Sequence, residues 1–214
     1  MRLRPVAFLS RFFAALNEAA LMTSDTDTFF GSRPTAGVTV TEDTALHLAA
    51  FWSCVRLIST AGGILPWGVY EATKAGGRRE RRDHRLWPTL HLEANPYTSA
   101  STWRQAVLWN ALVVGNGYSE ERRDGLWVLP SSAVETKRDD TTGVIYHEYA
   151  DPLKGGTKRI ILDSDMFHLK GPSRDGIVGL SVISAARENL SLSLATQTFG
   201  AAFFGNDTHV GGVY

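Results

Sequence analysis

Residues 167–214 read FHLKGPSRDGIVGLSVISAARENLSLSLATQTFGAAFFGNDTHVGGVY, and the architecture of the chain can be worked out from this segment. It opens with the end of a strand, turns at Gly171-Pro172 and continues through a charged loop, residues 173–176. Ser181 is a typical helix N-cap residue, and Gly205-Asn206 supplies residue types that end helices. We therefore predict one helix of about 25 residues from Ser181 to this stop, the longest element of the chain.

Apolar residues recur along this predicted helix at mostly helical spacing, which gives it one wide apolar face. Such a face usually packs on the core of its own domain. Small side chains would also allow close approach by a neighbouring element. The residues of the predicted core-facing stripe are Ile183, Ala186, Leu190, Leu194, Ala201 and Phe204.

A second helix is predicted to begin at Thr41, an N-cap type followed by Glu42 and Asp43 in the first turn. Carboxylates at this end favour the positive pole of the helix dipole. The helix should end at Gly62-Gly63, before Pro66. Its predicted apolar stripe consists of Ala45, Leu48, Phe51, Trp52, Val55 and Ile58.

The remaining elements are short and separated by turn signals. A strand is expected at residues 67–71, a short helix at 84–92, and a longer helix from 99–102 to Gly115. Five strands should then follow as a meander of hairpins, at residues 118–122, 126–129, 135–138, 144–149 and 159–162. Because strands and helices do not alternate regularly, the predicted fold class is α+β, with antiparallel hairpins and a long C-terminal helix.

The composition indicates a globular chain with an N-terminal extension. Of 214 residues, 43% are hydrophobic, and the 22 basic side chains balance the 22 acidic ones, so no net positive charge attracts nucleic acid. Cys54 is the single cysteine, which excludes disulfides within the chain. We predict that residues 1–37 form an amphipathic segment and a flexible linker, and that residues 38–214 form the folded body. The amphipathic residues are Leu9, Phe12, Phe13, Leu16 and Ala20.

One group of side chains suggests metal chemistry. Asp163, Asp165 and His168 have the ligand types that hold a divalent cation, as in a metal-dependent nuclease or hydrolase. The competing interpretation is an ordinary turn, because Asp163-Ser164-Asp165 is a common turn sequence and His168 would point to the opposite face of the strand that follows.

The run from Arg78 to Arg82 places four arginines in five residues. It could form a phosphate-binding patch of a small DNA-binding module. The plainer interpretation is a solvated edge strand whose charges discourage sheet aggregation. The sequence has no pattern for a nucleophile, a nucleotide cradle or a dinucleotide site, so we predict no catalytic, cofactor or metal residues and no enzyme activity. No apolar run is long enough to cross a membrane.

Five blocks in consistent order resemble the portal proteins of tailed bacteriophages, although no single block is specific. The resemblance covers about residues 40–213, and in it the position of Gly117 more often carries alanine. The blocks are residues 54–58 with Leu65-Pro66 and Val69-Tyr70; Leu90, Asn95-Pro96 and Trp103-Arg104; residues 115–118; Leu129-Pro130 with Val134; and residues 165–171 with 176–181.

This resemblance implies a structural protein that forms a ring, usually of twelve copies, at one vertex of the capsid. It further implies contacts with the major capsid protein, terminase and head-tail adaptor proteins. Double-stranded DNA would pass through the channel without sequence specificity. The protein would reside in the virion, and in the host cytoplasm during assembly. Residues 38–214 would correspond to the wing region only, truncated before the stem and clip.

Overall fold

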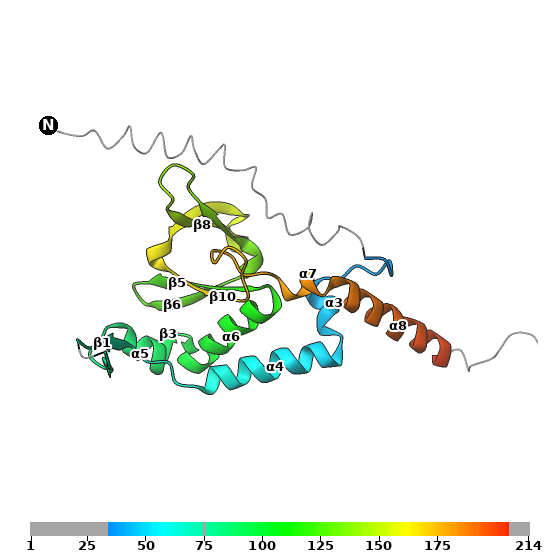
Figure 1. Cartoon of the computed structure of the whole chain (residues 1–214), viewed down its shortest axis with the longest axis horizontal. Helices are drawn as coiled ribbons and strands as arrows, with labels where there is room; N and C mark the ends of the chain where they lie inside the picture. The colour runs from blue at the N-terminus through cyan, green and yellow to red at the C-terminus, as the bar shows by residue number, and fades with distance from the viewer. Residues whose placement is uncertain (1–33, 75, 206–214) are drawn as a thin grey trace, which may run out of the picture.

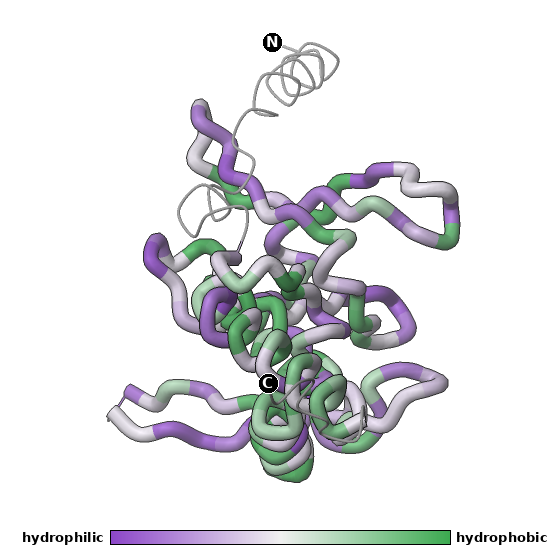
Figure 2. The backbone as a smooth tube through the Cα atoms, turned by 90° about the vertical axis from the view of Figure 1, so that its right-hand side faces the viewer, coloured by the Kyte–Doolittle hydropathy of each residue, from purple (hydrophilic) through white to green (hydrophobic). Residues whose placement is uncertain are grey.

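The computed structural model describes residues 34–74 and 76–205, so the predicted amphipathic segment lies outside the described residues. Two long helices underlie two small sheets, and the last helix extends from one side of the body (Figure 1). Apolar positions concentrate in the helices, whereas the hairpin loops are hydrophilic (Figure 2). The helices are α3 (Glu42–Leu46), α4 (Ala49–Ile64), α5 (Leu86–His91), α6 (Ala100–Val113), α7 (Val182–Ala185) and α8 (Arg187–Gly205).

The strands form two hairpins and two three-stranded sheets, all antiparallel. The α+β prediction is therefore confirmed. The hairpin strands are β1 (Tyr70–Ala72) with β2 (Arg78–Glu80), and β3 (Glu93–Asn95) with β4 (Thr98–Ser99). The sheet strands are β5 (Asn116–Arg122), β6 (Gly125–Leu129), β7 (Val134–Arg138), β8 (Ile145–Asp151), β9 (Thr157–Leu162) and β10 (Met166–Lys170).

The helix predicted from Thr41 is two helices. Thr41 does cap α3, since the amide of Thr44 donates to the Thr41 hydroxyl at 3.2 Å. The chain then bends at His47 and Leu48, where Leu48 has an extended backbone, and α4 begins. The bend places Ala45 and Leu48 in one buried cluster with Val55. No glycine or proline marks the bend, so helical periodicity alone missed it.

The predicted stripe on α4 was also partly wrong. Trp52 and Ile58 are exposed, and the buried face consists of Val55, Ser59 and Gly63. The cause is close packing of α4 on α6. A Cβ at Gly63 would lie 3.0 Å from the Cβ of Gln105 and 3.1 Å from the carbonyl oxygen of Ser101. Gly62-Gly63 lies in the last turn of α4, which ends at Ile64 close to the predicted end, and it also serves there as a close-contact site.

Helix α6 is the central support of the fold. It begins within the predicted range 99–102, and Ser99 caps it by accepting from the amide of Thr102. Trp103 and Val107 are fully buried between α6 and the first sheet, where they pack with Ala94 and Leu126. The Trp103 indole donates to the Ser119 hydroxyl at 2.8 Å, which satisfies two buried polar groups at once.

The predicted meander is two separate sheets, ordered β10-β5-β6 and β7-β8-β9. Strand β10 returns to the far edge of β5, with His168 opposite Tyr118. This pairing spans about fifty residues, and no local turn signal could predict it. An apolar cluster fills the space between the sheets. It contains Tyr118, Leu129, Tyr149, Ile161 and Met166.

The predicted long C-terminal helix is divided in two. Ser181 caps α7 as expected, accepting from the amide of Ser184 at 3.2 Å. The helical geometry is interrupted at Ala186, and α8 follows from Arg187. Only the first half of α8 packs on the body, through Leu190, Ser191 and Leu194. Ala201 and Phe204, which we expected to face the core, are exposed.

Two local predictions need smaller corrections. The strand expected at residues 67–71 lies at β1, and Trp67 instead packs edge-on against Trp103 at 5.7 Å. The β3-β4 hairpin was not predicted. Its Asn95 is buried and donates to the carbonyl of Leu126, which ties the hairpin to the first sheet.

Candidate assembly surfaces

The loop at residues 171–180 is held by Asn116 at the start of β5. The Asn116 side chain donates to the carbonyl of Gly179 at 2.8 Å and accepts from its amide at 2.7 Å. Gly179 lies so close to the backbone that a Cβ there would be 2.8 Å from the nitrogen of Gly171. Within the loop, Asp175 accepts from the amides of Ile177 and Val178, which lowers the pKa of its carboxyl. The loop is thus a fixed structural element.

His168 completes the same cluster. Its Nε2 lies 2.9 Å from Oδ1 of Asn116, an acceptor, so Nε2 must carry the proton. The ring stacks on Tyr118 at 4.3 Å. Burial, with a smaller contribution from His147, lowers the pKa of His168 to about 4, so the ring is neutral at physiological pH.

A chain of hydrogen bonds joins the two sheets beside this cluster. The Tyr118 hydroxyl lies 2.8 Å from Oγ1 of Thr136, which lies 2.9 Å from Nδ1 of His147. Nε2 of His147 lies 3.3 Å from Oδ1 of Asp163. Since a carboxylate only accepts, Nε2 donates to Asp163, Nδ1 accepts from Thr136, and Thr136 accepts from Tyr118. Burial outweighs Asp163 and lowers the pKa of His147.

The three residues considered for a metal site do not converge. Asp163 contacts His147, His168 contacts Asn116, and Asp165 is exposed beside Ser164. In residues 34–74 and 76–205, no group of three or more His, Cys, Asp or Glu side chains could hold a metal ion. The turn at 163–165 and the strand pairing separate the three side chains, so their arrangement gives no support to a nuclease site at these residues.

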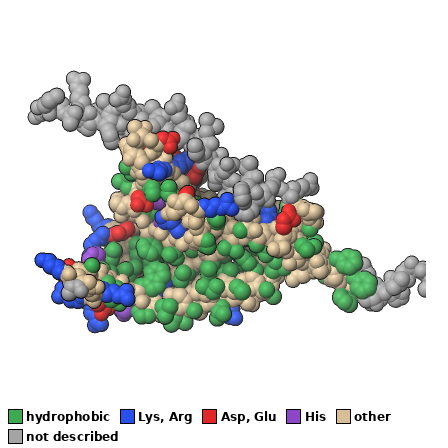
Figure 3. Space-filling view, viewed as in Figure 1, with side chains coloured by type: hydrophobic (Ala, Val, Ile, Leu, Met, Phe, Trp, Pro, Cys, Tyr) green, Lys and Arg blue, Asp and Glu red, His purple; other side chains and the backbone are tan. Residues whose placement is uncertain are grey.

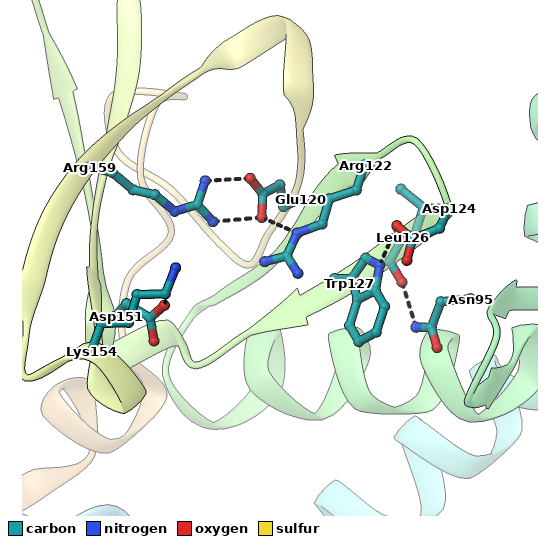
Figure 4. A network of polar contacts seen from close by, with 9 residues as sticks. All are labelled: Asn95, Glu120, Arg122, Asp124, Leu126, Trp127, Asp151, Lys154 and Arg159. Carbon is teal, nitrogen blue, oxygen red and sulfur yellow. Dashed lines mark hydrogen bonds and ion pairs between the residues drawn. The ribbon is translucent and has the colours of Figure 1, made fainter.

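A second tie between the sheets is a carboxylate shared by two guanidinium groups (Figure 4). Glu120 on β5 accepts from Nη2 of Arg159 on β9 at 2.6 Å and from Nε of Arg122 at 2.6 Å. Arg122 also lies over the Trp127 ring at 5.2 Å. Burial raises the pKa of Glu120, but the two arginines together outweigh it and lower the pKa. Tyr118 and Glu120 lie two residues apart on β5 and so share the face that meets the second sheet.

The arginine run forms an exposed hairpin in which acidic residues neutralise most of the charge. Arg81 pairs with Glu71 at 2.9 Å and with Asp83 at 2.7 Å, and this pairing lowers the pKa of Asp83 to about 2. Arg82 pairs with Glu80 at 3.0 Å, and Arg79 with Glu71 at 3.7 Å. This arrangement favours the solvated edge strand over a phosphate-binding patch.

Large apolar side chains are exposed on two helices (Figure 3). The exposed apolar side chains of α4 lie on the side of the helix away from α6. Together with Leu65, the C-cap residue, we call them the α4 stripe: Cys54, Leu57, Ile58, Ala61, Ile64 and Leu65. On α8 the exposed apolar side chains begin at Leu192, on the side of the helix away from the buried Leu190 and Leu194, and continue along the outward half. We call this set the α8 stripe: Leu192, the half-buried Ala195, Phe199, Ala202 and Phe203. Soluble monomers rarely expose contiguous apolar patches of this kind, so both stripes are candidate contact surfaces.

Comparison with known proteins identifies the family. A sequence profile described as Phage portal protein matches residues 49–214. The chain belongs to this family. It is 28% identical over 179 residues to the portal protein of Enterobacteria phage HK97, covering 78% of this chain and 40% of the relative. It is 29% identical over 195 residues to the probable portal protein of Streptomyces phage phiC31, covering 86% and 42%.

A solved structure shares the fold of this chain. The neck of an empty GTA particle, computed with C6 symmetry, superposes with a TM-score of 0.61 at 20% identity, covering 90% of this chain and 50% of that chain. The present chain thus spans about two fifths of the length of the curated portal relatives it matches. None of the helices in the described part of the chain has both the length and the hydrophobicity that a bilayer crossing requires.

Sequence reasoning did not single out the residues that fix the 171–180 loop and join the two sheets, namely Asn116, His147 and Glu120. Tyr118, Glu120 and Arg122 occupy every second position of one strand and therefore share a face. That period of two was the available signal for the inter-sheet tie. The α4 stripe also had a sequence signal, because Cys54, Ile58, Ala61 and Leu65 are separated by four, three and four residues. We instead assigned Ile58 to the core-facing stripe with Val55.

Proposed function

We propose that this chain acts as a structural portal subunit, or as the wing part of one, in a ring at the capsid vertex. Membership of the portal family over residues 49–214 carries this proposal. The partners that follow are further copies of the chain, the major capsid protein, terminase and head-tail adaptors. Double-stranded DNA would pass through the ring during packaging and ejection. The site of action would be the virion, with assembly in the host cytoplasm.

The described surfaces support a scaffold more than an enzyme. The buried polar residues hold sheets and loops together: Asn116 fixes a loop, and Glu120 joins two strands of different sheets. Their hydrogen bonds are made to other parts of the chain. By contrast, many of the exposed large apolar residues lie on α4 and α8, where another subunit could cover them. We therefore infer that the chain has no enzymatic activity of its own.

The balance of charge fits a non-specific relation to DNA. The chain has equal numbers of acidic and basic residues, and Glu71, Glu80 and Asp83 offset much of the charge of the arginine hairpin. DNA would therefore pass without tight binding to a single subunit.

Native mass spectrometry and negative-stain electron microscopy of the purified full chain test this proposal. We expect closed rings with one predominant subunit number, twelve by the family resemblance. Monomers or two-fold dimers across the micromolar concentration range would contradict it. A control at high salt should leave the rings intact, because apolar contacts are not screened by ions.

A further inference from the structure

The α4 stripe is an apolar surface that its own helix does not use for folding. The opposite face of α4 packs on α6 through Ser59 and Gly63. On the stripe, Leu57 is 70% exposed and Ile64 is 72% exposed. Arg56, the helix's one charged residue, does not share the three-and-four-residue spacing of the stripe. Such spacing is the pattern by which one helix packs along another.

The α8 stripe has the same pattern. Leu192, Ala195, Phe199 and Ala202 are separated by three, four and three residues. Phe199 is 73% exposed, and its ring stacks on Phe203 at 6.3 Å. From Asn189 to Gly205 the helix contains no charged residue. An exposed helix surface without charge is typical of a contact surface rather than a solvated one.

The two stripes cannot meet within one chain. The first half of α8 is anchored on the body by Leu190 and Leu194, and the second half runs outward beyond it (Figure 1). A second copy placed beside this outward end could receive α8 on its own α4. A contact between two different surfaces repeats from copy to copy, and it closes into a ring when the rotation permits. A surface that paired with itself would stop at a dimer.

We propose that the α8 stripe of one copy packs along the α4 stripe of the next copy, and that this helix pair is a contact between neighbouring subunits. The inference deepens the proposed function, because it rests on ring assembly and names the surfaces that would form it. Both stripes lack charge, both carry apolar residues at three-and-four-residue spacing, and they lie on different sides of the same chain. These three features favour a second copy as the occupant over an unrelated charged partner.

The single cysteine makes a direct test possible. Cys54 lies in the α4 stripe and is exposed. The substitution Ala202→Cys puts a second thiol in the α8 stripe. A 1:1 mixture of ¹⁵N-labelled and unlabelled A202C full chain, treated with a short bismaleimide, should give a ladder of covalent oligomers. Mass spectrometry should find peptides that join position 54 of one copy to position 202 of another, with mixed labels.

Matched controls separate this contact from chance collisions. The C54A/A202C double variant and the wild-type chain each have one thiol, so neither should extend beyond dimers. Adding Leu57→Asp to A202C should lower the yield of the 54–202 product at least tenfold. Circular dichroism should show the same fold in all variants, since positions 57 and 202 are exposed.

Each outcome decides the proposal. Mixed-label 54–202 products in a ladder support it. Products joining 54 to 54 only, products with a single label, or no product above the controls would overturn it. If rings are seen by microscopy while the 54–202 product is absent, the inference fails and the proposed function stands. If the chain stays monomeric, both fail for this chain, and the stripes would then be covered by further sequence of a longer protein.

Discussion

The backbone of Gly179 and the side chain of Asn116 exchange two hydrogen bonds, at 2.7 Å and 2.8 Å, across 63 residues of sequence. The pair fixes the loop 171–180 against the start of β5. Because both ends of the Asn116 amide are used, no other residue type has the donor and the acceptor in the right positions. This loop leads directly into α7 and α8, so its position determines where the α8 stripe points.

Replacing Asn116 with alanine should destabilise the chain by about 2–4 kcal/mol, because the amide and carbonyl of Gly179 would be buried without partners. Urea denaturation measures the change, and hydrogen exchange should show faster exchange within residues 171–180. As a control, Asn110→Ala removes only one bond to the Ala106 carbonyl within α6, and should cost about 1 kcal/mol or less. Equal costs for both variants would contradict the account.

Two glycine-to-alanine substitutions should have opposite effects. At Gly63 the new methyl group would press on Gln105 and on the carbonyl of Ser101, so we expect a loss of about 1–3 kcal/mol. At Gly200, in the exposed part of α8, no atom lies within 4 Å of the new Cβ. There, alanine should stabilise the helix by about 0.5–1 kcal/mol. Thermal and urea unfolding of both variants provide the check, and the same sign at both positions would refute the described packing of α4 on α6.

Stability should fall as the pH falls from about 6.5 to about 4. The pKa of His168 is lowered to about 4 and that of His147 is also lowered, so the unfolded chain binds more protons than the folded chain in this range. Above the unfolded pKa of about 6.5 both states are neutral, and these residues contribute no pH dependence. Urea unfolding at pH 7.0, 6.0 and 5.0 measures the slope. His168→Gln, which retains an N–H donor toward Asn116, should reduce the slope.

Removal of the Glu120 carboxylate should weaken the tie between the sheets. Glu120→Ala leaves Arg159 and Arg122 without their shared partner, and we expect a loss of about 1–3 kcal/mol. The figure is modest because both guanidinium groups are partly exposed and water can solvate them. The matched control Glu71→Ala breaks ion pairs on the exposed hairpin and should cost less than about 1 kcal/mol. A larger effect at Glu71 than at Glu120 would contradict the assignment.

Local signals predicted much of the secondary structure. The caps at Thr41 and Ser181 were correct, because an N-cap depends on a hydroxyl and an amide only three residues away. The strands between residues 116 and 162 were also found, since turn residues separate them. The α+β class followed from this order.

The arrangement in space was harder to predict. The break at Ala186 and the bend at Leu48 have no glycine or proline signal, and tertiary packing determines them. Strand β10 pairs with β5 across about fifty residues, which separated a predicted meander into two sheets. On α4 the glycines correctly indicated the end of the helix, but their second role, as the small residues that let α6 approach, was not predicted. We assigned the buried face of α4 from its hydrophobic residues, whereas close packing on α6 determines which face is buried. The α4 stripe was therefore missed.

A cryo-electron microscopy reconstruction of the assembled full chain tests the central claim most directly. The account predicts a closed ring around a central opening, with each copy folded as described and with Phe199 of one copy against Leu57 of the next. A two-fold dimer, an open filament, or a monomer with both stripes exposed to solvent would contradict it.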